Sequence, residues 1–308
     1  MKIEGSPVYP LITPFKKSGS IDYRSLNNYI NYLTNSGVKV IISTVGTSRF
    51  NLLDNSEVVE INNKFIEFVN GKSITLCAGP IYGSFEVNKK ALQEAINSGG
   101  NGYLAIYPER FYSEESIQKF YFDLAEKSSI PIFIHQMSLR SGYGGTVNYS
   151  KSLITKLMSH DNILGMKEES QDKNLSNWIH QNYSNNKLII GQGGMLNFIN
   201  DYEFGAKSYL VGLGSFLPNI EEQFHKHLLA NEKKEAINIK RSYEDEYFKV
   251  AVSLGWHVQL KEVLFFMNLM SNYERLPLEP LEKFKSDQLY NFLKNHKLLS
   301  LEIEKFKL

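Results

Sequence analysis

The stretch NILGMKEES, residues 162–170, leads an apolar run directly to a lysine. Ile163, Leu164 and Met166 make this run hydrophobic enough for a strand that is buried on both faces. Lys167 follows within the same run, although a charged side chain is costly to bury. We infer a strand that delivers the Lys167 amine to its carboxyl end.

Seven other short runs share this nearly continuous hydrophobicity and richness in β-branched residues, which is typical of strands covered on both faces. They begin at Val8, Val38, Ser73, Gly102, Ile130, Lys187 and Lys207. Amphipathic stretches that end at glycine lie between the runs, as in residues 23–37 and 85–100. This composition is typical of helices that alternate with the strands.

Eight strands alternating with helices, at spacings of about 20 to 35 residues, favour an α/β fold of the (β/α)8 TIM-barrel type. A doubly wound open sheet is the alternative, because periodicity does not show whether a sheet closes. After Pro218 the strand pattern stops and helical patterns continue. We therefore predict a barrel domain over residues 1–220 and a C-terminal helical region over residues 221–308.

Composition narrows the class of protein. A formal net charge of +1 gives no electrostatic reason to expect a nucleic acid or an anionic membrane as partner. No run has the length of a membrane span, and the N-terminus lacks the apolar run of a signal peptide. Cys77 is the only cysteine, which fits a reducing cytoplasm, and its apolar surroundings predict a core residue.

The ends of the predicted strands bring several reactive residue types to one place. Active sites of such barrels form where strands end and the following loops begin, so Lys167, His135 and the pair Thr47–Ser48 should converge on one mouth. An amine walled by apolar side chains holds its proton less tightly, because desolvation penalises the charge. Lys167 is thus a candidate nucleophile that forms a Schiff base with a ketone.

Five stretches, in order along the chain, carry a resemblance to a known family. They are PLITPFKKSGSID (10–22), SGVKVIISTVGTSRFNLLDNSE (36–57), PIFIHQMSLRSG (131–142), NILGMKEESQD (162–172) and GAKSYLVGLGSFLP (205–218). They resemble the strands and loops of the pyruvate-dependent class I aldolases, the dihydrodipicolinate synthase and N-acetylneuraminate lyase family. The resemblance implies a TIM barrel, with Lys167 as the imine-forming residue of a lyase.

The resemblance also implies roles for other residues and partners. Thr47 and Ser48, whose backbone N–H groups suit a small carboxylate, would hold a 2-oxo acid such as pyruvate. Arg140 would orient a second carbonyl substrate through bidentate bonds to a carboxylate. Gly191 and Gly214, in glycine clusters after the last two strands, would leave room around the imine. No metal or organic cofactor is implied, and a homotetramer or homodimer is expected.

The chain departs from the family pattern at the proton relay. Family members usually end the fifth strand in a tyrosine, where this chain has His135, and Gly46 replaces the first hydroxyl residue of the carboxylate-binding pair. The tyrosine after the fourth strand has two nearby candidates, Tyr107 and Tyr112. His135 exchanges protons near neutral pH, which favours a hydroxy-oxo-acid aldolase or lyase.

Three alternatives remain. The chain could be a 4-hydroxy-tetrahydrodipicolinate synthase, or a non-catalytic 2-oxo-acid-binding or regulatory barrel whose relay has decayed. The glycine loops at residues 191–194 and 212–215 would suit a phosphosugar enzyme, but they contain no basic residue. The first loop also lacks dinucleotide-binding spacing. His225 and His227 do not share a helix face, and we expect both on a solvated surface.

Overall fold

A computed structural model describes most of the chain, namely residues 5–81, 83–107, 113–137, 141–142, 145–146 and 149–298. The chain folds into two compact units. The first combines the chain up to Pro10 with Lys39–Leu210, and the second combines Leu11–Val38 with the chain from Val211 onwards. The predicted division at residue 220 remains a prediction. Arg140 and Tyr112 lie outside the described residues.

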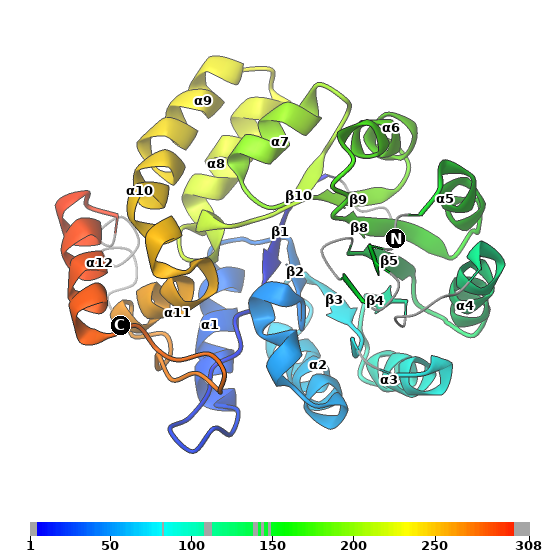
Figure 1. The fold of residues 1–308 in the computed structure, drawn as a ribbon, viewed down its shortest axis with the longest axis horizontal. Helices are drawn as coiled ribbons and strands as arrows, with labels where there is room; N and C mark the ends of the chain where they lie inside the picture. The colour runs from blue at the N-terminus through cyan, green and yellow to red at the C-terminus, as the bar shows by residue number, and fades with distance from the viewer. Residues whose placement is uncertain are drawn as a thin grey trace. The chain divides into compact units, whose positions relative to one another are not determined.

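The first unit contains a closed barrel of eight parallel strands (Figure 1), in the order β1-β10-β9-β8-β5-β4-β3-β2. The strands are β1 (Pro7–Pro10), β2 (Val40–Ile42), β3 (Ile74–Ala78), β4 (Gly102–Ile106), β5 (Ile132–Gln136), β8 (Ile163–Glu168), β9 (Leu188–Gly191) and β10 (Ser208–Leu210). Each lies within or overlaps one of the predicted apolar runs. The TIM barrel is therefore confirmed, and the open sheet is excluded.

Helices follow the strands of this unit and lie outside the barrel (Figure 1). They are α2 (Asn55–Val69), α3 (Phe85–Asn97), α4 (Glu114–Glu126), α5 (Lys151–Met158), α6 (Lys173–Tyr183) and α7 (Met195–Tyr202). Short elements fill two connections: the 3-10 turns η1 (Gly46–Ser48) and η2 (Phe50–Leu52), and the hairpin of β6 (Ser141–Gly142) with β7 (Gly145–Thr146). Most helix starts carry a Ser or Asp cap, as Asp54 and Glu57 do for α2 through a capping box.

An apolar cluster contributed by the strands forms the core of this unit. Its buried members are Val8, Val40, Ile42, Val45, Leu76, Ala78, Leu104, Phe133, Leu188, Ile190 and Leu210. Because side chains alternate along a strand, residues two positions beyond these members face the same side. The His135 side chain therefore points to the same side of the sheet as Phe133 and the rest of the core cluster.

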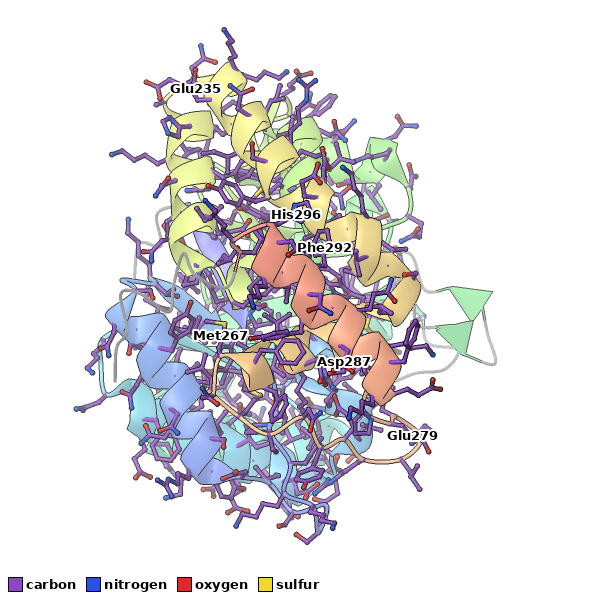
Figure 2. All side chains as sticks on the ribbon, turned by 90° about the vertical axis from the view of Figure 1, so that its left-hand side faces the viewer. Glu235, Met267, Glu279, Asp287, Phe292 and His296 are labelled. Carbon is purple, nitrogen blue, oxygen red and sulfur yellow. The ribbon has the colours of Figure 1, made fainter. Side chains whose placement is uncertain are left out.

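The second unit is helical. It comprises α1 (Tyr23–Asn35), η3 (Leu213–Ser215), α8 (Pro218–Leu229), α9 (Lys233–Ser242), α10 (Glu244–Leu254), α11 (Trp256–Phe266) and α12 (Lys283–Asn295). Buried Lys261 pairs with Glu274 at 2.9 Å and lies over the Phe15 ring, 4.5 Å from its centroid. Near the end of α12 the ring centroids of Phe292 and His296 are 4.2 Å apart, and both residues are labelled in Figure 2.

Two sequence-based expectations concern this helical unit. The expected C-terminal helices are present. The solvated position expected for His225 is wrong, because this residue is 5% exposed on α8. His227 is one-third exposed and its Nδ1 lies 2.5 Å from a carboxylate oxygen of Glu232. Across the described part of the chain, none of the helices has both the length and the apolar character needed to cross a membrane.

Candidate active site

Lys167 lies near the carboxyl end of β8 with only 2% of its surface exposed. Its strand neighbours are His135 on β5 and Ile190 on β9. Gly165, two residues earlier, packs so closely on β9 that an added Cβ would collide with the Leu188 carbonyl group. The β8 and β9 backbones approach each other closely at Gly165. This contact sets the position of β8 and therefore of Lys167.

His135 is the direct partner of Lys167 in the parallel pairing of β5 with β8. It is 4% exposed and follows Phe133 of the barrel core by two residues. The alternation of side chains therefore turns its imidazole to the same side as the core cluster. The predicted meeting of the lysine and the histidine at one end of the barrel is thus present in the fold.

Glu169 joins these two residues. One carboxylate oxygen, Oε1, contacts Lys167 Nζ, and the other, Oε2, lies 3.1 Å from His135 Nε2. The Glu169 backbone N–H donates to the Gln136 carbonyl at 3.1 Å, which continues the β5–β8 ladder one step beyond the strand. The side chain of Glu169 is 23% exposed, whereas its two partners are nearly inaccessible. The carboxylate therefore forms the open side of a three-residue cluster.

The charges of this cluster compensate one another. Burial by itself would raise the pKa of Glu169, but the Lys167 charge and the His135 hydrogen bond hold it well below the usual value. The carboxyl group is therefore ionised throughout the neutral range. A negative charge at this place stabilises positive charge on the lysine nitrogen, whether that nitrogen is an ammonium or a protonated imine.

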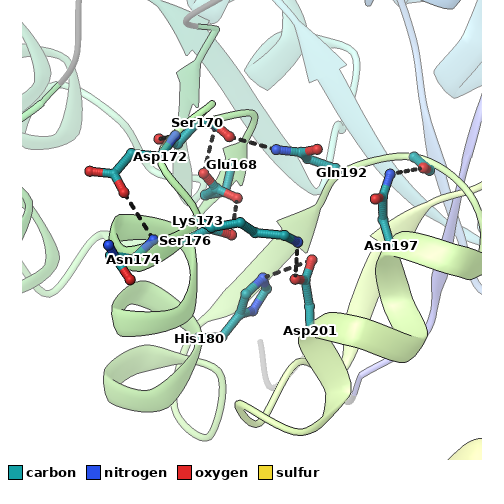
Figure 3. Close-up of polar contacts among 11 residues, drawn as sticks. Glu168, Ser170, Asp172, Lys173, Asn174, Ser176, His180, Gln192, Asn197 and Asp201 are labelled. Atoms are coloured by element: carbon teal, nitrogen blue, oxygen red, sulfur yellow. Dashed lines mark hydrogen bonds and ion pairs between the residues drawn. The ribbon is translucent and has the colours of Figure 1, made fainter.

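The neighbouring Glu168 has different surroundings (Figure 3). It accepts hydrogen bonds from Ser176 Oγ on α6 at 2.8 Å and from the Ser170 backbone N–H at 2.6 Å. Burial raises the pKa of Glu168 to about 7, although these two bonds lower it. Glu168 thus ties β8 to α6, on the face of the strand opposite to that of Lys167.

A polar cluster of α6 and α7 residues lies beside this contact (Figure 3). The exposed Lys173 side chain places Nζ 3.0 Å from Oδ1 of buried Asp201, and His180 Nε2 is 4.0 Å from Asp201 Oδ2. His180 Nδ1 is 3.0 Å from Ser184 Oγ. Burial lowers the pKa of His180 to about 4 against the opposing effect of Asp201. A Cβ on Gly191 would lie 3.3 Å from His180 Nε2. Glycine at 191 therefore gives room to this histidine, and the role predicted for Gly191 beside the imine remains a prediction.

The loop after β2 carries Thr47 and Ser48, both buried, in the 3-10 turn η1. The Ser48 N–H donates to the Val45 carbonyl at 2.9 Å, so this N–H is already bonded. Arg49 is 1% exposed and donates through Nη1 to the Thr47 carbonyl at 2.7 Å. Because parallel strands end on the same side of a barrel, this loop and Lys167 belong to the same mouth.

Other predicted residues have structural contacts of their own. The Tyr107 ring packs edge-on against Phe120 of α4, with centroids 5.2 Å apart. Gly214 belongs to the second unit, where its N–H donates to Glu221 Oε2 at 2.7 Å. The roles predicted for Gly214 and Arg140 remain predictions. Glu169 is the residue that sequence reasoning missed, and its signal was the two-residue spacing from Lys167.

Comparisons with known proteins agree on the family. The family model described as the dihydrodipicolinate synthetase family matches residues 5–296. A curated 4-hydroxy-tetrahydrodipicolinate synthase of Chlorobaculum parvum is 26% identical over 91% of this chain and 92% of that protein.

Solved structures share the fold. Dihydrodipicolinate synthase from Aquifex aeolicus has a TM-score of 0.84 at 21% identity, covering 96% of this chain and 99% of the other. N-acetylneuraminate lyase from Fusobacterium nucleatum has a TM-score of 0.85 at 16% identity, covering 95% and 98%. The match over nearly the whole chain, together with a lysine at the end of β8, leads to one conclusion. This chain belongs to the dihydrodipicolinate synthetase family and is a lyase of the pyruvate-dependent class I aldolase type.

Proposed function

We propose that this lyase acts on a hydroxy-2-oxo acid, cleaving or forming the C–C bond next to a pyruvate unit through an imine on Lys167. The observation that carries the proposal is the buried Lys167 amine with His135 as its direct strand partner. A primary amine in such surroundings attacks a ketone carbon, and the protonated imine then draws electrons from the adjacent C–C bond.

His135 is proposed to move the protons of the reaction. In the cleavage direction, a base removes the proton from the hydroxyl group beside the breaking bond, and an acid returns a proton to the enamine carbon. Histidine can do both near neutral pH. Thr47 and Ser48 are proposed to hold the carboxylate of the 2-oxo acid through their side chains or the Thr47 N–H. Arg140 is proposed to orient the second carbonyl substrate.

A 4-hydroxy-tetrahydrodipicolinate synthase is the second candidate. The name of the curated relative from Chlorobaculum parvum supports it. The sequence speaks against it at two positions: His135 stands at the end of β5, where the resemblance leads us to expect tyrosine, and Gly46 stands in place of a hydroxyl residue. The change in the residue that would carry protons supports a second substrate different from that of the synthase.

Borohydride trapping tests the imine. Reduction in the presence of pyruvate should add a stable mass to the peptide that contains Lys167, and Lys167→Ala should abolish the addition. A panel of 2-oxo acids, followed by aldehydes with each acid that traps, would identify the substrates. If no 2-oxo acid gives an adduct, the proposed imine on Lys167 is wrong.

We further propose that the enzyme works in the cytoplasm as a homotetramer or a homodimer. The single cysteine is consistent with a reducing compartment. Size-exclusion chromatography with light scattering would measure the oligomer, and a monomer would contradict this part of the proposal.

A further inference from the structure

We propose that Glu169 is a further catalytic residue of this enzyme: it accepts the proton that Lys167 must lose before attack, and it acts as one unit with His135 in the later proton transfers. The inference rests on the proposed imine chemistry at Lys167. It assigns a role to a carboxylate whose two oxygens touch the two reacting side chains.

The proton balance of imine formation requires a group that accepts a proton from Lys167 and later returns it. A lysine ammonium and a ketone become a protonated imine and one water, without net gain or loss of protons. One proton leaves Nζ before the C–N bond forms, and one arrives at the carbinolamine hydroxyl as the C–O bond breaks. Glu169 Oε1 touches Nζ and can take the first proton, because the Lys167 charge that holds the pKa of Glu169 low is removed by the same transfer. The pair of Glu169 with His135 can return it to the hydroxyl, which departs as water.

The second half-reaction uses the same pair. With pyruvate alone, a base removes a proton from C3 of the protonated imine, which becomes a neutral enamine. Positive charge then moves from the lysine nitrogen to the Glu169–His135 pair, where the carboxylate lies 3.1 Å from Nε2 and stabilises it. Return of a proton to C3 reverses the step. The carboxylate therefore faces a compensating positive charge both beside the protonated imine and beside the enamine.

The surroundings of Glu169 separate it from a structural glutamate. Its strand neighbour Glu168 is wholly buried and bonded to Ser176 and to the Ser170 backbone. Glu169 keeps 23% of its side chain exposed and bonds the lysine and the histidine. Two adjacent glutamates with the same chemistry thus differ in what they touch, and Glu168 serves as the matched control.

Exchange of the pyruvate methyl protons with deuterated water, followed by proton NMR, tests the inference without knowledge of the second substrate. Glu169→Gln keeps the shape of the side chain but removes its charge and its basicity. We expect exchange to slow by about 100-fold or more, the ordinary effect of losing a general base. Glu168→Gln should exchange at close to the wild-type rate. Unfolding temperatures of both variants should show that they remain folded.

Chemical rescue makes the test independent of folding effects. Glu169→Ala should be slow, and added formate should restore part of its exchange rate, because the partly exposed position can admit a small carboxylate. Lys167→Ala with formate should stay inactive. Exchange by Glu169→Gln at the wild-type rate, or no response of Glu169→Ala to formate, would overturn the role of Glu169. Failure of the wild type to form a borohydride adduct would instead overturn the imine chemistry itself.

Discussion

His135 and Lys167 lie directly opposite each other in the pairing of β5 with β8, and both are buried at the same end of the barrel. Backbone pairing alone therefore brings together an imidazole and an amine that are 32 residues apart in sequence. Glu169 bridges them. The arrangement is set by strand register rather than by flexible loops, so it is preorganised before substrate arrives.

Removing the imidazole should separate imine formation from turnover. His135→Phe keeps an aromatic ring of similar size but cannot carry a proton. We expect turnover to fall by roughly 100-fold or more, while pyruvate still traps at Lys167 under borohydride. The wild-type rate should change between about pH 5 and 8, the range of histidine ionisation. A variant with an unchanged pH profile would return the proton transfers to Glu169, Tyr107 or water.

Arg140 should act on the second substrate only. Arg140→Ala should raise the KM of an acidic second substrate about tenfold or more, because a charged hydrogen bond is lost. Exchange of the pyruvate methyl protons should remain near the wild-type rate. A parallel loss of both activities would mean that Arg140 supports the loop instead of recognising substrate.

The raised pKa of Glu168 predicts a pH-dependent effect on stability. The group titrates at about 7 in the folded chain and near 4.5 when unfolded, so the folded state binds its proton more tightly. Ionising the buried Glu168 carboxyl group therefore lowers the free energy of unfolding. This loss is absent below about pH 4.5, grows as pH rises and is complete above about pH 7. This difference corresponds to about 3 kcal/mol. Glu168→Gln should gain stability relative to wild type by about this amount between pH 4.5 and 8, measured by denaturant unfolding. If the difference in unfolding free energy between Glu168→Gln and wild type did not change with pH, the raised pKa of Glu168 would be wrong.

Gly165 should not tolerate a side chain. In Gly165→Ala the added Cβ meets the Leu188 backbone, which cannot move aside without breaking the β8–β9 ladder. We expect a loss of about 3 kcal/mol or more in unfolding free energy, at the upper end for overpacking. Borohydride trapping should fall with it. Gly193→Ala is the control, since its nearest contact would be the Leu210 carbonyl oxygen at 3.5 Å, an ordinary distance.

Cys77 should be inert in the folded protein. Burial raises its pKa to about 12, and no part of its surface is exposed. Because the thiolate is the reactive form, a disulfide reagent should label Cys77 only after unfolding. Labelling rates with and without denaturant would measure this, and rapid labelling of the native protein would contradict the buried position.

The barrel could be predicted because each of its strands has a recognisable hydrophobic pattern in the sequence. Nearly continuous apolar runs such as those ending at His135 and Lys167 can be read without knowledge of their neighbours. The convergence of these two residues followed from the rule that parallel strands end on one side.

Interactions between distant parts of the chain could not be read in this way. From the sequence, Glu169 resembles a solvated residue that follows a strand. In the structure its N–H donates to the Gln136 carbonyl on β5, which holds it beside Lys167 and His135. The Ser48 N–H, expected to bind a carboxylate, is already bonded to Val45. Gly191 gives space to His180 on a helix, a contact that no local pattern reveals. Partners of this kind depend on tertiary packing.

The alternation of side chains along β8 limits how this enzyme can change by mutation. Lys167 and Glu169 lie on one face of the strand, and Glu168 lies on the other with Ser176. Inserting or deleting one residue between Gly165 and Glu169 would exchange these faces, placing the lysine against α6 and the wrong glutamate in the mouth. Active clones from a random library should therefore contain substitutions at Glu168 but no single-residue insertions or deletions within this segment. Changes of length should accumulate instead in the loops that follow the strands.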